Sequence, residues 1–230
     1  MNRLLVIAVL LLSSLWSYTQ ENADKEIDSL YKEDQFYAGI TYNLIGNQPK
    51  NLSQSGFSLG FHLGFIKDMP INDARNMAIG IGLGYSANSY NQNLLISKNN
   101  FGNVRYSVLD NSSTYTKNKL STHILEVPIE FRWRTSTPTN YNFWRIYAGF
   151  KLGYVFANTS NYEGDLGSIK NRNLKDFNNL QYGFTISTGF NTWNLYVYYA
   201  LNKMFAEEAL INGDNIDMNA VKIGLMFYIL

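Results

Sequence analysis

The alternation of apolar and polar residues along the chain is the most informative feature of this sequence. In the segment from Leu125 to Arg134, apolar and mostly charged positions alternate without interruption. One set is Leu125, Val127, Ile129, Phe131 and Trp133, and the other is Glu126, Pro128, Glu130, Arg132 and Arg134. Because successive side chains of a strand point to opposite faces, this segment predicts a strand with one apolar and one charged face. The charged face meets water in a soluble protein, and it lines the lumen in a closed membrane barrel.

Seven further segments show the same period of two. The expected strands are Phe36 to Leu44, Gly56 to Ile66, Met77 to Ala87, Leu120 to Arg134, Trp144 to Phe156, Leu180 to Phe190, Trp193 to Leu201 and Asn219 to Leu230. Most of them come close to the ~9–11 residues that a tilted strand needs to cross the apolar core of a membrane. The pattern therefore predicts an all-β, eight-stranded antiparallel transmembrane barrel rather than a soluble sandwich.

The lengths of the connections support the same fold. Short connections follow the second, fourth and sixth strands, at 67–76, 135–143 and 191–192. Longer ones follow the others, at 45–55, 88–119, 157–179 and 202–218. Outer-membrane barrels have short periplasmic turns and longer outer loops, so both chain ends are expected in the periplasm. The long connections are rich in Asn, Ser and Tyr and are interpreted as solvated loops.

Aromatic residues mark the two expected membrane interfaces. Trp133, Trp144 and Trp193 all flank short turns, and amphipathic rings prefer the level of the lipid headgroups. An opposite girdle is expected from Tyr85, Tyr154, Phe156 and Tyr182. The alternative interpretation is three unrelated core tryptophans.

The inward face is expected to hold a structural network of charges. Its members are Glu126, Glu130, Arg132, Arg134, Arg145, Lys151 and Lys222. Unpaired buried charges are costly, so we expect cross-strand contacts between Glu126 and Lys151 and between Glu130 and Arg145. The alternative is an anion or proton site.

Glycines on the second and third strands leave space for these long side chains, namely Gly60, Gly64, Gly80, Gly82 and Gly84. This arrangement predicts a plugged lumen without a general pore. Pro128 lacks a ladder N–H group, so a bulge or an interrupted ladder is expected there.

The chain begins with features of a secretory signal. Arg3 precedes a short apolar core from Leu4 to Leu12, and small residues follow, so residues 1–20 are interpreted as a signal peptide. A buried N-terminal helix is the alternative. Residues 21–35 are expected to form a short periplasmic segment, either one helix or a frayed leader, and residues 36–230 the barrel domain.

Composition excludes several function classes. The chain has no cysteine, which excludes disulfides and thiol chemistry, and its net charge of +1 gives no case for nucleic acid. His62 is expected to point inward and His123 outward, which makes them a poor metal pair. Ser121 and His123 share the outward face, as in lipid-modifying barrel enzymes, but no acidic third residue accompanies them. We therefore expect a protein that is not an enzyme and has no cofactor, metal or small-molecule substrate.

A family resemblance rests on the block from Leu125 to Arg134 (LEVPIEFRWR), followed by Phe143 to Tyr147 and Gly149 to Tyr154. These segments resemble the PorT family of outer-membrane barrels of Bacteroidetes, and the likeness extends through Phe36 to Asn43 and Phe57 to Tyr90. The resemblance implies an accessory role in the type IX secretion system, which exports proteins and supports gliding motility. Outer-membrane lipid and other secretion subunits are then the expected partners. The alternatives are a generic small barrel for adhesion or membrane integrity and, from another class, a lipid-modifying enzyme.

Overall fold

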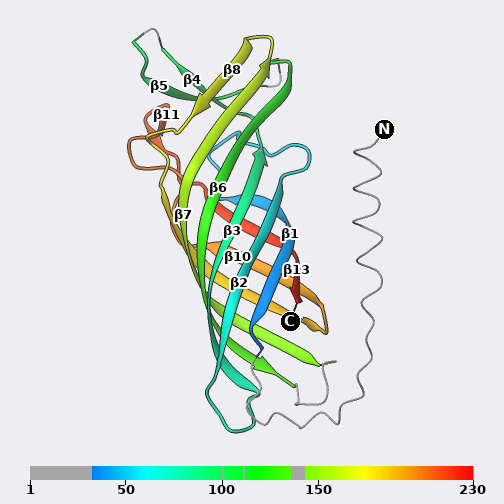
Figure 1. The fold of residues 1–230 in the computed structure, drawn as a ribbon. Coiled ribbons are helices and arrows are strands. Elements are labelled where there is room, and N and C mark those ends of the chain that lie inside the picture. The colour runs from blue at the N-terminus through cyan, green and yellow to red at the C-terminus, as the bar shows by residue number, and fades with distance from the viewer. Residues whose placement is uncertain (1–32, 100, 111, 136–142, 230) are drawn as a thin grey trace, which may run out of the picture.

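The computed structural model describes residues 33–99, 101–110, 112–135 and 143–229, and the expected signal peptide lies outside these ranges. Eight antiparallel strands form a closed barrel (Figure 1). They are β1 (Gln35–Gly46), β2 (Leu59–Pro70), β3 (Met77–Asn91), β6 (Tyr115–Arg134), β7 (Trp144–Gly164), β9 (Leu180–Phe190), β10 (Trp193–Ala200) and β13 (Asn219–Ile229). Each pairs with the next barrel strand in sequence, and β1 pairs with β13 to close the sheet. The predicted fold class is confirmed.

Burial alternates along the barrel strands as the period of two requires. In β1, every second residue from Gln35 to Asn43 is buried and the residues between are exposed. The outward set is apolar and includes Phe36, Leu83 and Trp193, each more than 60% exposed at 62%, 64% and 64%. A continuous apolar exterior of this extent is unfavourable in water and is what lipid contact requires.

The barrel wall has very unequal heights. β6 has 20 residues and β7 has 21, whereas β10 has 8. Strand β7 pairs with β9 along Trp144–Tyr154 and with β8 (Gly167–Arg172) along Thr159–Gly164. The upper parts of β6 and β7 together with β8 thus rise beyond the rim (Figure 1), and we call this three-stranded sheet the extension. Both strands extend further toward the loops than predicted, since the predicted limits were Leu120 for β6 and Phe156 for β7.

The long connections are not simply solvated, which corrects the prediction from their polar composition. They contain the hairpin of β4 (Leu94–Lys98) and β5 (Val104–Val108) and the short pair β11 (Leu210–Ile211) and β12 (Asp214–Asn215). Buried apolar residues from these connections form a cluster at the loop end of the barrel, which we call the cap: Leu94, Ile96, Tyr106, Phe177, Met204 and Phe205. Ring contacts of 5.5 and 5.3 Å link Phe205 to Tyr106 and Phe177.

Asparagine side chains in these connections form hydrogen bonds with backbone groups of the packed loops. The Asn93 side chain is buried and donates to the carbonyl oxygens of Asn51 and Leu109 at 3.0 and 3.1 Å. Its own side-chain oxygen accepts from the Ser53 amide at 2.7 Å. A high content of Asn therefore reflects polar satisfaction of an irregular, packed backbone here.

Pro128 interrupts the ladder, as expected. On the side of β3, pairing is present at Ile81–Ile129 and Gly84–Glu126 and is missing at the two positions between them. The side of β7 remains paired at Pro128–Lys151. The irregularities in this hairpin lie elsewhere, between Tyr115 and Lys117 and between His123 and Ile124. The lost donor of proline thus opens one side of the strand without shifting the register.

At the end of the barrel with the short turns, β9 and β10 are joined by a tight connection of two residues. Asn191 adopts a left-handed conformation (φ 55°) in the two-residue turn after β9, as hairpins of this length require. Strand β2 continues to Pro70, further than the predicted Ile66, so Asp68 belongs to the strand and points inward. Among the described residues, no helix is long and apolar enough to cross a membrane.

Candidate functional site

The charged lumen at the turn end is organised around Asp68. Arg134 donates from Nη1 and Nη2 to the two carboxylate oxygens of Asp68, at 2.9 and 2.8 Å. Arg132 donates from Nη1 to Asp68 Oδ1 at 3.1 Å. All three side chains are completely buried. One carboxylate therefore receives two guanidinium groups, in the planar geometry that makes such pairs strong.

Small residues on β3 make these contacts possible. Asp68 is on β2 and the arginines are on β6, so β3 lies between the partners. At this level β3 contributes only Ala78 and Gly80 to the lumen, opposite Arg132 and Glu130. A Cβ atom at Gly80 would lie 2.8 Å from Nε of Arg132. The arginine side chain thus occupies the space that glycine leaves, as the sequence predicted.

The first described residues of the chain complete this turn-end cluster. Arg132 also donates to the side-chain oxygen of Gln35 at 3.1 Å and to Glu130 Oε2 at 3.2 Å. Glu33 Oε1 lies 3.6 Å from Nε of Arg134, and Asp34 Oδ1 accepts from the amide of Asp68 at 2.7 Å. The segment entering β1 is therefore tied to the lumen charges. Neither Asp68 nor Glu33 was among the residues predicted from the sequence, because both lie outside the expected strands.

Arg145 does not form the expected contact with Glu130. Register places Arg145 opposite Arg134 and places Gly149 opposite Glu130. Nε and Nη1 of Arg145 are buried without a hydrogen-bond partner among the described residues. Its guanidinium carbon instead lies 4.5 Å from the ring centroid of Phe143, with Tyr147 and Tyr228 at 5.9 and 5.7 Å. The prediction of a Glu130–Arg145 pair was wrong because the hairpin register separates the two residues.

A second cluster surrounds Glu126 in the middle of the barrel. Lys151 donates to Glu126 Oε2 at 2.9 Å, which is the contact expected across the β6–β7 hairpin. Ser86 donates to Oε1 of the same carboxylate at 2.7 Å, and His62 Nδ1 lies 3.7 Å from Oε2. The imidazole Nε2 and the Thr41 hydroxyl are 3.0 Å apart. The carboxylate is thus held by groups from three strands, and it faces protein groups rather than water.

Tyrosine rings occupy much of the lumen around the two clusters. Six inward tyrosines of the barrel wall are buried: Tyr37, Tyr90, Tyr147, Tyr196, Tyr198 and Tyr228. The amino group of Lys151 lies 5.0 Å from the Tyr196 ring and that of Lys222 lies 5.1 Å from the Tyr198 ring, distances typical of cation–π contacts. Lys222 has no ion pair among the described residues. The sequence analysis assigned the lumen to charges and glycines and missed these rings, although the alternation places every one of them on the inward face.

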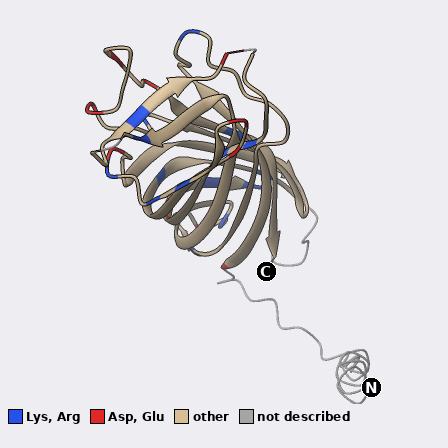
Figure 2. Cartoon of the chain, turned by 90° about the horizontal axis from the view of Figure 1, so that it is seen from above, with Lys and Arg blue, Asp and Glu red and all other residues tan. Residues whose placement is uncertain are grey.

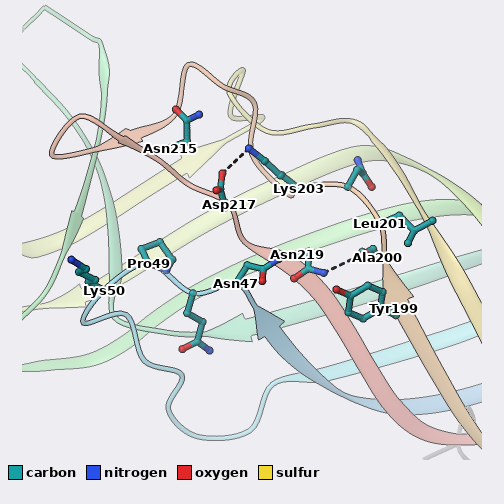
Figure 3. A pocket seen from close by; sticks show the side chains of 12 residues that line it. Asn47, Pro49, Lys50, Tyr199, Ala200, Leu201, Lys203, Asn215, Asp217 and Asn219 are labelled. Atoms are coloured by element: carbon teal, nitrogen blue, oxygen red, sulfur yellow. Dashed lines mark hydrogen bonds and ion pairs between the residues drawn. The ribbon is translucent and has the colours of Figure 1, made fainter.

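The interior encloses a small cavity above the central cluster. A cavity of ≈ 10 Å³ lies between the central cluster and the cap, lined by Thr122, Gln181 and Lys222 among others. That is about the space of one water molecule. A larger open groove of ≈ 780 Å³ lies at the loop end, between residues 47–50 and the segments that follow β10 (Figure 3). There Lys203 and Asp217 form an ion pair at 2.6 Å, and this contact raises the pKa of Lys203.

The predicted interface aromatics lie outward near the turn end. Trp144 and Trp193 are 58% and 64% exposed, and both neighbour Phe190 in register. The Trp193 and Phe227 ring centroids are 4.9 Å apart. Trp133 also faces outward and is half-buried, opposite Met77 and Ile146. The structure therefore brings these rings to one level of the barrel wall.

The two histidines lie on opposite faces. His62 is buried in the lumen, whereas His123 points outward. Nδ1 of His123 and the Tyr85 hydroxyl are 2.7 Å apart and share a hydrogen bond. Within the described ranges, no three His, Cys, Asp or Glu residues gather in a group suited to a metal ion. In the view from above, blue Lys and Arg positions lie both on strands and in loops, while most red acidic positions lie in loops (Figure 2).

A model of the outer membrane protein beta-barrel domain matches residues 19–206, which is well over half of the 230-residue chain. The chain belongs to this family. Strand β13 lies beyond the matched range, and it closes the barrel of this family member by pairing with β1 and β10. No curated protein matches the chain. The family membership agrees with the closed barrel and its apolar exterior, and it points to an outer-membrane location.

Proposed function

We propose that this chain is a non-enzymatic outer-membrane barrel that serves as an accessory component of type IX protein secretion. The observation that carries the proposal is the filled lumen. Ion pairs centred on Asp68 and Glu126, the inward tyrosines and the cap occupy the interior, and the cavity between the central cluster and the cap has room for about one water molecule. A barrel without a passage does not transport solutes through its lumen, so its surfaces are the parts that can interact with other molecules. Binding to other subunits is therefore the function that this geometry supports best.

The assignment to type IX secretion is supported by the resemblance of the block Leu125 to Arg134 to PorT-type barrels. In the structure, the residues of this block line the lumen on one face and form the exterior on the other. Its even positions supply Glu126, Arg132 and Arg134, which take part in the hydrogen bonds of both lumen clusters. Its odd positions form part of the apolar exterior. The resembling residues are therefore those on which the closed interior depends.

The proposal of a non-enzymatic role is supported by the surroundings of His123. The lipid-modifying alternative requires His123 and Ser121 to act together with an acidic residue. The ring of His123 instead contacts Tyr85 and Phe156, with centroids 6.1 and 6.0 Å away. Tyr85 also holds Nδ1. No carboxylate is hydrogen-bonded to this histidine among the described residues.

Hairpin tips at the loop end offer surfaces for a partner. Phe101, in the turn between β4 and β5, is 90% exposed, and Leu166, in the turn between β7 and β8, is 58% exposed. Apolar side chains at exposed tips contribute little to packing within the chain. They fit the contact of these hairpins with a larger secretion subunit.

Cells depleted of the protein test the proposal. Type IX cargo should accumulate in the periplasm and disappear from the medium, and the wild-type gene should restore export. The variant Phe101→Ser/Leu166→Ser should fold and fail to restore export, whereas the matched loop variant Leu210→Ser should restore it. Normal export in depleted cells would remove the secretion role and leave a general surface barrel for adhesion or membrane integrity.

A further inference from the structure

The outward face of the extension carries a cluster of cations. Alternation along β6, β7 and β8 turns Asn118, Ser160, Tyr162 and Asn171 inward, where they are buried. The opposite face presents four basic side chains, Lys117, Lys119, Lys170 and Arg172. The only carboxylate among the outward positions of these three strand segments is Glu163, which accepts from Lys117 at 3.1 Å. Four cations and one anion leave a net charge of +3 on this face, which we call the basic face.

Register arranges the basic face in rows that run across the three strands. Ser121, Thr159 and Arg172 form the lowest row, and Lys119, Asn161 and Lys170 form the next. Lys117, Glu163 and Ser168 form the highest row. The cations therefore come from two separate strands and lie close together on one flat surface. Asp165 in the following turn is the nearest further carboxylate in sequence, and it is occupied by Tyr162 and by the amides of Thr114 and Leu166.

The basic face continues the lipid-facing surface of the barrel without a break. Directly below it lies an outward aromatic cluster of Tyr85, His123 and Phe156, whose ring centroids are 6.0 to 6.2 Å apart. Below that cluster the same faces of β6 and β7 carry Leu125 and Tyr154, 48% and 55% exposed. Aromatic rings of this kind mark the boundary between the apolar core and the headgroups.

Spacing along the strands places the cations at headgroup depth. Two residues of a strand advance about 6.6 Å, and less along the membrane normal in a tilted strand. The headgroup layer on one side of a bilayer is roughly 5–8 Å thick. Arg172 stands one row above the aromatic cluster, and Lys119 and Lys170 stand two rows above it. These side chains, long enough to bend toward the membrane, therefore reach the level of lipid phosphates.

We propose that the basic face binds the phosphate groups of anionic lipids in the leaflet at the loop end of the barrel. The face combines cations, flanking Ser and Thr hydroxyls and direct continuity with the lipid-facing wall, and phosphates accept from all of these donors. Binding there would fix the depth and tilt of the tall side of the barrel. The inference rests on the membrane location in the proposed function and is independent of secretion, since it is tested in purified lipid.

Vesicle reconstitution of the full mature chain tests the proposal. The protein is placed in phosphatidylcholine vesicles with a minority of phosphatidylglycerol, extracted in mild detergent, and analysed by native mass spectrometry for retained lipid. The variant Lys117→Gln/Lys119→Gln/Lys170→Gln/Arg172→Gln should lose phosphatidylglycerol, roughly fivefold for each charge removed at low salt. The matched control Lys50→Gln/Lys98→Gln/Arg105→Gln/Lys175→Gln removes four exposed loop charges and should retain the lipid.

A charge-conserving variant guards against a trivial loss of fold. Lys117→Arg/Lys119→Arg/Lys170→Arg should retain phosphatidylglycerol as the wild-type protein does. Equal loss from the basic-face variant and the loop control would overturn the proposal. Displacement of the lipid by inorganic phosphate, at an ionic strength where chloride displaces nothing, would also overturn it, because the face would then hold a free anion. Defective export with intact lipid retention would bear only on the secretion proposal.

Discussion

Arg134 and Asp68 form a bidentate ion pair that spans the width of β3 inside the barrel, with both side chains completely buried. Strands β6 and β2 are not neighbours, so backbone pairing does not connect these two residues directly. The pair, reinforced by Arg132, therefore joins second-nearest strands and braces the turn end against shear. Tertiary geometry of this kind explains how a lumen that contains five buried basic side chains remains closed.

Removal of the central carboxylate should destabilise the barrel strongly. Asp68→Asn leaves the Arg132 and Arg134 guanidiniums without their shared counter-ion, and breaking a buried pair in this way costs about 3–5 kcal/mol. Urea unfolding in lipid vesicles, followed by the mobility shift between folded and unfolded protein on electrophoresis, measures the change. The matched control is Asp73→Asn, at an exposed position in the turn after β2, and it should be within error of wild type. Similar stability of the two variants would refute the bracing role.

The contact between Glu126 and Lys151 should appear as energetic coupling. Glu126→Lys and Lys151→Glu each place like charges together in a buried site, whereas the double variant restores an opposite pair. A double-mutant cycle should give a coupling free energy of about 0.5–3 kcal/mol. Restoration will be partial because Ser86 donates to the native carboxylate at 2.7 Å. Strict additivity of the two single changes would rule out direct pairing.

Gly84 should be intolerant of a side chain because of Tyr37. A Cβ atom at Gly84 would overlap with the Tyr37 hydroxyl, so Gly84→Ala should destabilise the barrel by about 1–3 kcal/mol through overpacking. Tyr37→Phe removes that hydroxyl and should recover part of the loss. Alone, Tyr37→Phe should be nearly neutral, because the hydroxyl has no hydrogen-bond partner among the described residues. If Tyr37→Phe deepened the defect of Gly84→Ala, the steric explanation would be wrong.

The filled lumen should not conduct ions as a pore. Reconstituted protein in a planar bilayer should show no stable conductance steps, since the central cluster and inward tyrosines occupy the interior. Residues 94–108 contain three of the cap residues. Replacing this segment by a short flexible link should leave the conductance of the bilayer unchanged, because the central cluster lies below the cap. Porin-like steps from wild-type protein would contradict the closed interior, and steps from the shortened chain alone would assign the barrier to the cap.

Acid should loosen the tip of the extension before it affects the barrel. Asp165 accepts hydrogen bonds from Tyr162 and from the backbone amides of Thr114 and Leu166, and the first of these is the main reason that its pKa is lowered. Because the folded-state pKa is below the unfolded value near 3.8, the stabilisation is present above that pH and is lost as pH falls through the folded pKa. The protection of the Thr114 and Leu166 amides against hydrogen exchange, measured relative to the intrinsic rate at each pH, should therefore fall at low pH. Asp165→Asn should remove this pH dependence, and persistence of it would point to another group.

Much of the fold follows from local pattern. Period-two alternation identified all eight barrel strands and both faces of each, since a strand turns successive side chains to opposite sides whatever its neighbours are. The alternation of short and long connections gave independent support for an outer-membrane barrel, in which short turns and longer loops alternate. The interruption of the β3–β6 hydrogen-bond ladder near Pro128 was also predicted, because the missing N–H group is a property of proline itself.

The parts that pattern missed depend on atoms brought together from distant positions. Asp68 was assigned to a turn, because the period fades after Ile66 and only pairing with β3 extends the strand to Pro70. The apolar cap was missed because short apolar runs such as Leu94 to Ile96 have no partner in sequence; they are buried only where the loops of several strands meet.

The sequence by itself determined the strands, their two faces and the polar character of the lumen, because these depend on side-chain order along one extended backbone. Only the tertiary structure decided which charges meet. The register of the β6–β7 hairpin places Lys151, and not Arg145, within reach of a carboxylate, and closure of the sheet brings Asp68 across β3 to two arginines. Contacts inside a barrel depend on how far each strand is shifted along its neighbours. That shift is set when the whole sheet closes, and the sequence of a single strand does not determine it.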